Sequence, residues 1–404
     1  MKGSPLSGTL SFLLPDPAEA ALLAVCTSPG RAREAWAEWR RLGGDLDRYR
    51  SLLPQVAAGT REGSLELDQP LAALLSAARL HESLRWNAIR QIAGEVIDRL
   101  GGLGLDFLVM QGLALAETVY PDPALRHCGS LELLLPAGAV AEAGAVLDAV
   151  SARGDGFPLR LSASPLPRVK PGAGASAILN RSRDAQITGR MVRVPAPEDA
   201  LALVLGGAAV GAERRTLLWV CDATRQIEAA PGIDWDVVAG VTAAWDLGIP
   251  IGAMLGWLAS DLDVPIPRAA VKRVARASSG SRAHAIETAL ECVRADGRAG
   301  PGSLLARSRG WREMASVLRW TAFPSADRMR RSYPGIPTAF FPLLYAARPG
   351  LYAARKSLGF LTRHRRPNAD GGPLVRAVGS AAARSGGPSA AVADPASANP
   401  RSWE

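Results

Sequence analysis

The sequence predicts an α+β protein that is predominantly helical, with a small sheet held between an N-terminal and a C-terminal helical region. Alanine, leucine and arginine are abundant and aromatic residues make up only 5% of the chain, a composition that favours helices. Two short apolar runs, at 106–112 and 129–136, are typical of buried strands. With 404 residues, 48% of them hydrophobic, the chain is long enough to bury a sizeable core.

The N-terminal region, residues 18–104, is expected to form successive helices. Its last part, 81–104, places aliphatic residues at helical spacing and stops at a Gly-Gly pair. A strand should follow at 106–112, DFLVMQG, where the unbroken apolar run indicates cover on both faces.

A compact α/β unit is predicted next. A short helix ends near Tyr120, and Pro121 and Pro123 then force a turn. GSLELLLP, 129–136, is the second strand, a helix covers 137–150, and FPLRLS, 157–162, is the third strand. Ser130 and Glu132 share one strand face, because side chains alternate with a period of two.

The remaining chain is expected to be a loop followed by helices. Residues 163–186 are rich in Pro, Gly, Ser and Ala, which predicts a long loop. Helices should begin at 195–210 and 215–230, the second carrying Asp222, for which we expect a buried hydrogen bond to an arginine or to backbone. Further helices run to about 320, and the polar, proline-rich tail is expected to be disordered.

These elements divide the chain into six parts. We place an N-terminal helical region at 1–104, the α/β core at 105–165, a loop-rich connection at 166–194, a C-terminal helical region at 195–330, a basic amphipathic segment at 331–366 and a disordered tail at 367–404.

Composition narrows the classes of function. The four cysteines and four histidines show no metal-ligand spacing, which indicates a reduced cytoplasmic protein with buried thiols and argues against a zinc site. No apolar stretch is long enough to cross a bilayer. Residues 307–366 hold 13 Lys/Arg and two acids, so segment 340–366 is predicted either to contact a membrane surface or an acidic partner, or to pack on the body with its arginines in solvent. Nucleic-acid binding is not favoured, because no recognised module accompanies the charge.

The run FLVMQGLALAETVYPDPALRHCGSLELLLP, 107–136, resembles the uncharacterised nucleotidyltransferase family of the polymerase-β-like superfamily. Gly112, Tyr120, Pro121, Arg126 and Gly129 fit the family's pattern, and flanking segments extend the likeness over roughly residues 20–360. The resemblance implies a polymerase-β-like sheet on which Mg²⁺, held by carboxylates, transfers a nucleotide from an NTP to an acceptor molecule or protein. It assigns Glu132 to catalysis and to the metal, and Gln111, Gly112, Arg126, Gly129 and Ser130 to nucleotide binding.

The chain departs from the family where the metal ligands should stand. Ser130 replaces the first aspartate, Glu132 replaces the second, and Gln111 stands where the family has lysine. Arg160 lies on the third strand where an acid is expected, and the next acid, Asp155, precedes that strand. A serine hydroxyl is a weak Mg²⁺ ligand and an arginine repels the ion. We therefore predict that Mg²⁺-dependent transfer is impaired or lost while nucleotide or partner binding is retained.

Several alternatives stay open from sequence. Glu132 is either a residual ligand or an acid paired with Arg126 or Arg160. Gln111 and Gly112 form a phosphate-binding turn or a plain turn, and Arg126 contacts phosphate or braces its own turn. As a whole the protein could instead be an active enzyme that modifies a small molecule, sugar or peptide. It could also be a membrane-peripheral or scaffold protein that acts through its basic C-terminus.

Overall fold

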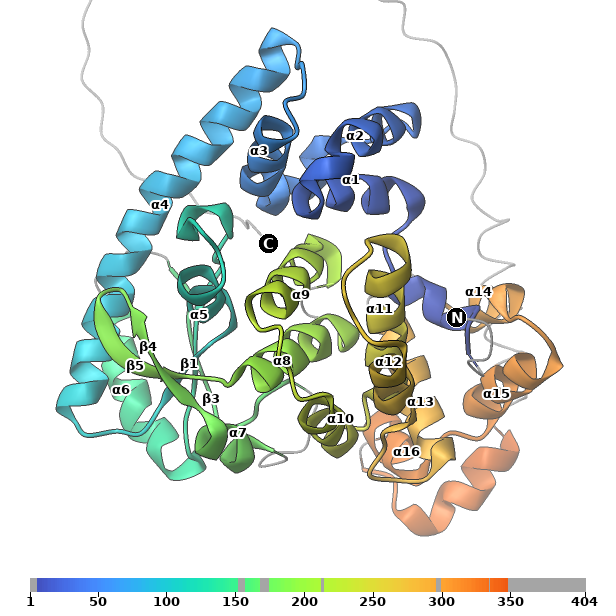
Figure 1. The fold of residues 1–404 in the computed structure, drawn as a ribbon. Helices are drawn as coiled ribbons and strands as arrows, with labels where there is room; N and C mark the ends of the chain where they lie inside the picture. The colour runs from blue at the N-terminus through green and yellow to red at the C-terminus, as the bar shows by residue number, and fades with distance from the viewer. Residues whose placement is uncertain are drawn as a thin grey trace, which may run out of the picture. The chain divides into compact units, whose positions relative to one another are not determined.

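The computed structural model describes residues 6–151, 157–167, 174–211, 214–295, 299–333 and 335–347 (Figure 1). Residues up to Ala346 form one unit of the fold. The predicted tail at 367–404 and most of the basic segment at 340–366 lie outside the described residues.

The N-terminal region is helical, as predicted. It consists of η1 (Thr9–Leu13), α1 (Pro17–Thr27), η2 (Pro29–Arg31), α2 (Ala32–Arg41), η3 (Leu46–Leu52), α3 (Leu53–Glu62) and α4 (Gln69–Gly102). A capping box starts α1, in which the Asp16 carboxylate accepts from the Glu19 amide and the Glu19 carboxylate from the Asp16 amide. The 34-residue α4 begins at the Asp68 cap and packs along α3 and α6.

Three short strands form the sheet of the α/β core. They are β1 (Leu108–Met110), β2 (Leu131–Leu134) and β3 (Leu159–Ser162), with β1 antiparallel and β3 parallel to the central β2. Between β1 and β2 lie α5 (Gln111–Thr118) and η4 (Pro123–Leu125), and between β2 and β3 lie η5 (Ala137–Ala139) and α6 (Val140–Ser151). The predicted order of elements from 106 to 162 is therefore confirmed.

The two faces of this sheet belong to different cores. Val109, Leu131 and Leu133 pack into a cluster with residues of α4 and α6. Leu108, Met110 and Leu134 point the other way and join a core that includes α8, α9 and α11. Both faces are covered, as the continuous apolar run at 107–110 predicted.

The predicted loop at 163–186 is wrong over its second half. Residues 175–181 form α7 (Ala175–Arg181), and β4 (Arg183–Ile187) pairs antiparallel with β5 (Arg190–Val194). Thr188 and Gly189 connect the strands with φ angles of 52° and 80°, as a two-residue hairpin turn of the mirror-image type requires. Burial of Ile187, Val192 and Val194 in the cluster around α4 stabilises a segment whose composition resembles a loop.

The C-terminal region is helical from α8 onward. It comprises α8 (Pro197–Ala209), η6 (Arg214–Thr216), α9 (Leu218–Ala229), α10 (Trp235–Ala244), α11 (Gly248–Asp261), α12 (Arg268–Arg276), α13 (Arg282–Arg294), α14 (Pro301–Arg307), α15 (Trp311–Ala322), α16 (Ala326–Ser332) and η7 (Thr338–Phe340). In the described ranges, no helix combines the length and the hydropathy needed to cross a bilayer.

Candidate functional site

The strand β2 presents a serine and a glutamate on the sheet face that looks toward the C-terminal helices. The Ser130 hydroxyl donates a 3.1 Å hydrogen bond to Oε1 of Glu132, which confirms that the two side chains share a face. The Glu132 side chain is 19% exposed, so it keeps only partial access to solvent.

An arginine lies directly beside this glutamate. The register pairs Glu132 with Arg160 on β3 and with Met110 on β1. One guanidinium nitrogen of Arg160 lies 3.5 Å from Glu132 Oε1, and the Arg160 side chain is 67% exposed. Of the alternatives left open by the sequence, the structure favours pairing of Glu132 with Arg160, while Arg126 has another partner.

The described residues of this face do not fit a two-metal site. Mg²⁺ in proteins is held by carboxylates and substrate phosphates, and two ions need several such oxygens. Here the groups that contact the Glu132 carboxylate are the Ser130 hydroxyl and the Arg160 guanidinium. No group of three or more His, Cys, Asp or Glu suited to a metal occurs among the described residues, and Asp155 lies outside them.

Gln111 stands at the junction of β1 and α5 in a strained conformation. Its φ of 44° lies in the left-handed region, which a non-glycine residue adopts at a cost of about 1–3 kcal/mol. The side chain is buried, and its Oε1 has no hydrogen-bond partner. It borders a narrow cavity with Thr118 of α5, Arg183 of β4 and Gln226 of α9. Sequence reasoning missed Arg183 and Gln226, which lie 72 and 115 positions further along the chain.

Gly112 makes room for an arginine. A Cβ atom at this position would lie 2.6 Å from Nη1 of Arg126, closer than real Cβ contacts, and 3.1 Å from the Cys128 sulfur, which is a tight contact. Steric fit to the Arg126 side chain therefore explains the glycine without a phosphate. Gly129 is different, because nothing lies within 4 Å of a Cβ built there. Its predicted role in nucleotide binding stays a prediction.

The guanidinium of Arg126 is buried against Asp222. Nε donates to Oδ1 at 3.2 Å and Nη2 to Oδ2 at 2.8 Å, so the pair is bidentate. Nη1 donates to the carbonyl of His127 at 3.0 Å, within the same turn. Arg126 is thus held between α9 and the turn before β2, which supports a bracing role and confirms the expected hydrogen-bonding role of Asp222.

Tyr120 completes this buried network. Its hydroxyl donates to Oδ1 of Asp222 at 2.7 Å, and the side-chain amide of Gln55 donates to Tyr120 at 3.5 Å. Burial, followed by the negative charge of Asp222, raises the pKa of Tyr120 well above its ordinary value. The tyrosine therefore stays protonated and acts as a hydrogen-bond donor.

A second polar cluster joins α4 to His127, in the turn before β2. The carboxylate of Glu82, which is buried, accepts a 3.0 Å hydrogen bond from Arg85 and lies 3.0 Å from Nδ1 of His127. Burial alone would raise the pKa of Glu82, but the hydrogen bonds and charges of His127 and Arg85 outweigh it and lower the pKa. No sequence pattern indicates this pairing of Glu82 with His127 across 45 positions.

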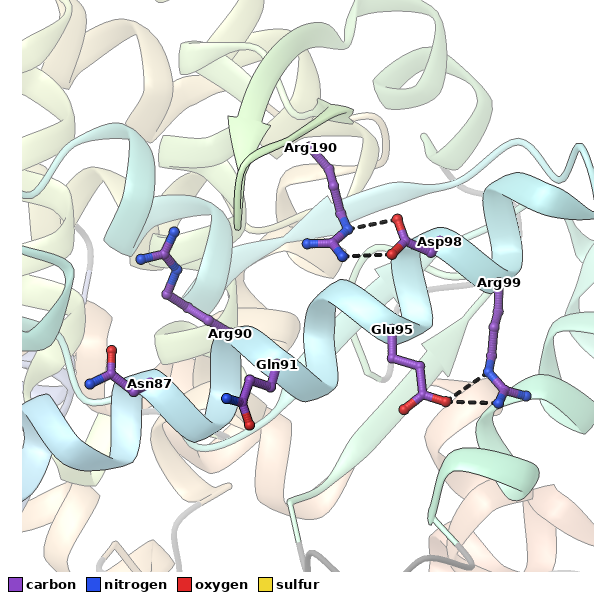
Figure 2. Close-up of a pocket in the computed structure, with 7 residues that line it drawn as sticks. All are labelled: Asn87, Arg90, Gln91, Glu95, Asp98, Arg99 and Arg190. Carbon is purple, nitrogen blue, oxygen red and sulfur yellow. Dashed lines mark hydrogen bonds and ion pairs between the residues drawn. The ribbon is translucent and has the colours of Figure 1, made fainter.

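A large groove lies elsewhere on the surface of the described residues. It has a volume of about 820 Å³ and follows α4 to Arg190 on β5, and none of its lining residues comes from β1, β2 or β3 (Figure 2). Arg190 forms a bidentate pair with Asp98, and Arg99 pairs with Glu95. These two arginines are paired with acids of the same groove, and its third arginine, Arg90, lies 3.7 Å from Glu117 of α5, so each arginine already has an acidic neighbour.

The sequence from α2 to α6 matches a known family model. Residues 38–155 match the family described as "Uncharacterised nucleotidyltransferase". This similarity covers 118 of the 404 residues of the chain. The match covers part of the span of about 20–360 over which the resemblance was traced, and it ends just before β3 and Arg160. Comparisons with curated proteins and with solved structures found no match.

Proposed function

We propose that this nucleotidyltransferase-like protein binds the phosphates of a nucleotide at the face formed by β2 and β3 and does not catalyse Mg²⁺-dependent nucleotidyl transfer. The observation that carries the proposal is the pairing of Glu132 with Arg160, at the place where the family resemblance implies a cluster of acids. The hydrogen bond from Ser130 to the same carboxylate supports it.

The proposal depends on the charge of this face. Two-metal transfer needs a net negative ligand set that holds the cations, which then neutralise the triphosphate. In this protein the negative charge of Glu132 is offset by Arg160, so the pair is close to neutral. Arg160 is mostly exposed, and its planar guanidinium can exchange a carboxylate for a phosphate oxygen. The site is thus better suited to an anion than to a divalent cation.

Nucleotide binding tests the first half of the proposal. We expect calorimetric titration with ATP, GTP, CTP and UTP to show binding of at least one of them, with the same affinity in Mg²⁺ and in EDTA. Arg160→Ala should weaken binding about tenfold, since a charged hydrogen bond contributes roughly 1.5–3 kcal/mol. Arg99→Ala removes another ion-paired arginine, on α4, and should leave the affinity unchanged. If no nucleotide binds the wild-type protein, our proposal fails, and the alternative of a membrane-peripheral or scaffold protein is favoured.

Turnover tests the second half. We expect no Mg²⁺-dependent release of pyrophosphate from any NTP, with or without candidate sugar or peptide acceptors. The triple variant Ser130→Asp, Glu132→Asp, Arg160→Ala should gain Mg²⁺ binding, because it restores two carboxylates on one strand face and removes the cation. If the wild type releases pyrophosphate and Glu132→Gln does not, the protein is an active nucleotidyltransferase and this half of the proposal fails.

A further inference from the structure

The helix α15 exposes a row of large apolar side chains. Trp311, Met314 and Leu318 are spaced by three and four residues and are 71%, 44% and 51% exposed. The opposite face, with Val317 and Trp320, is buried against the body. Besides the apolar side chains that it buries, this helix therefore has a second apolar row, which faces solvent.

Arginines flank this row and acids do not. Arg312 and Arg319 are exposed on the same helix, and the Arg312 guanidinium lies 5.5 Å from the centre of the Trp311 ring. From 299 to 347 the sequence has seven arginines and two acids. One of these acids, Glu313, is buried and accepts hydrogen bonds from the amides of Thr9 and Arg309. The sequence from 348 to 366 adds six more cations and no acid.

The segment after α16 extends the apolar surface. The Tyr345 hydroxyl donates to the carbonyl of Pro324 at 2.7 Å, and its ring lies 6.5 Å from that of Phe323, just after the end of α15. Phe323, Phe340 and Leu343 are 58%, 52% and 68% exposed. We call Trp311, Met314, Leu318, Phe323, Arg312 and Arg319 the α15 face; the helix that carries it is labelled in Figure 1.

We propose that the α15 face binds the anionic surface of a lipid bilayer. Tryptophan and leucine beside arginine on an exposed helix ridge match the chemistry of a membrane interface, where rings enter the headgroup layer and cations meet lipid phosphates. A second copy of the chain is a poorer occupant, since pairing two α15 faces would bring their arginines together. This inference is independent of the nucleotide site.

Vesicle co-sedimentation of the full chain tests the proposal. We expect binding to phosphatidylglycerol vesicles at least about tenfold tighter than to phosphatidylcholine vesicles, because each cation near an anionic surface contributes about 1 kcal/mol. Trp311→Ser with Leu318→Ser should weaken phosphatidylglycerol binding at least about tenfold. Arg312→Glu with Arg319→Glu should do the same and reduce the preference for the anionic lipid.

Exposed leucines on α4 provide the matched control. Leu80→Ser with Leu84→Ser removes two apolar side chains that are 62% and 63% exposed, and it should leave vesicle binding unchanged. Unchanged thermal unfolding would show that each variant folds. Three results would overturn the proposal: equal binding to both lipids, wild-type binding by the Trp311/Leu318 variant, or a dimer in lipid-free solution that this variant abolishes.

Discussion

At the scale of single residues, the Glu132 carboxylate has two neighbours: the Ser130 hydroxyl, two positions earlier in the chain, and the Arg160 guanidinium on β3. The period of two along a strand was enough to place Ser130 and Glu132 on one face, and their hydrogen bond confirms it. The choice of Arg160 as the partner depends on the register between β2 and β3, which are separated by a whole crossover through α6. The register between two strands that are far apart in the sequence is set by packing, so it cannot be predicted from the residue pattern of either strand alone.

Gly112 is a second case in which the sequence indicated the residues but did not show which of them are in contact. The family resemblance singled out Gly112 and Arg126 separately as nucleotide-binding residues. In the structure the two meet, because the space left by the missing Cβ holds the Arg126 guanidinium. The sequence shows a glycine, but only the fold shows what occupies the space beside it.

Gly112→Ala should therefore destabilise the protein. The added methyl group would meet Arg126, which cannot move away without weakening its bidentate pair with Asp222. We expect a loss of about 1–3 kcal/mol in the free energy of unfolding, measured by urea titration. Gly144→Ala is the control, because this glycine lies within α6 with nothing inside 4 Å of a Cβ, and alanine should stabilise the helix there by up to about 1 kcal/mol. Equal stability of Gly112→Ala and wild type would contradict the steric role.

At the scale of elements, prediction succeeded where the apolar pattern is continuous or periodic and failed where polar residues interrupt it. The 34-residue α4 and the apolar strands β1 and β2 stand out by pattern. The hairpin β4–β5 was missed because its strands carry five charged or polar residues among ten and follow a stretch rich in proline and glycine. The Thr-Gly pair at 188–189 was the available signal, since a two-residue turn containing glycine marks hairpins.

The attachment of α4 to the turn before β2 should be sensitive to acid. Glu82 is charged in the fold, where His127 and Arg85 lower its pKa below the ordinary value of 4.5. A carboxyl group whose pKa is lower in the folded state stabilises the fold above its unfolded pKa, and this contribution is lost as the pH falls through the folded pKa. The cluster should therefore contribute fully at neutral pH and progressively less below pH 4.5.

Glu82→Gln tests this pH dependence. At pH 7 the variant should be less stable than wild type by about 1–3 kcal/mol, because Arg85 and His127 lose a charged partner. The difference should shrink in urea titrations carried out at successively lower pH below 4.5. Glu66→Gln changes an exposed glutamate before α4 and should follow the wild-type curve at every pH. A difference between Glu82→Gln and wild type that stays constant with pH would rule out this role of the carboxylate.

At the scale of the whole molecule, one buried ion pair joins the region that matches the family model, residues 38–155, to the C-terminal helices. Arg126 lies within the matched span and Asp222 lies on α9, 96 positions further along. The side chains are 6% and 0% exposed, so neither charge can turn to solvent if its partner is lost. The Tyr120 hydroxyl adds a second bond between the same two parts of the fold. We expect this network to fix how α9 sits against the turn that leads into β2.

Asp222→Ala should lower the free energy of unfolding by about 3–5 kcal/mol, since it leaves the Arg126 charge buried without its carboxylate. Tyr120→Phe keeps the ion pair and should cost only about 1 kcal/mol, the usual net value of one hydrogen bond.

The double variant Arg126→Met, Asp222→Leu replaces both charges with apolar groups. It should be more stable than Asp222→Ala alone, because burying two uncharged side chains avoids the desolvation cost that a single unpaired charge incurs. Urea unfolding of the three variants, and of the single variants Arg126→Met and Asp222→Leu, completes the comparison. If the double variant lost as much as the sum of the single losses, Arg126 and Asp222 would be acting independently, and the two parts of the fold would have to be held together by their apolar contacts.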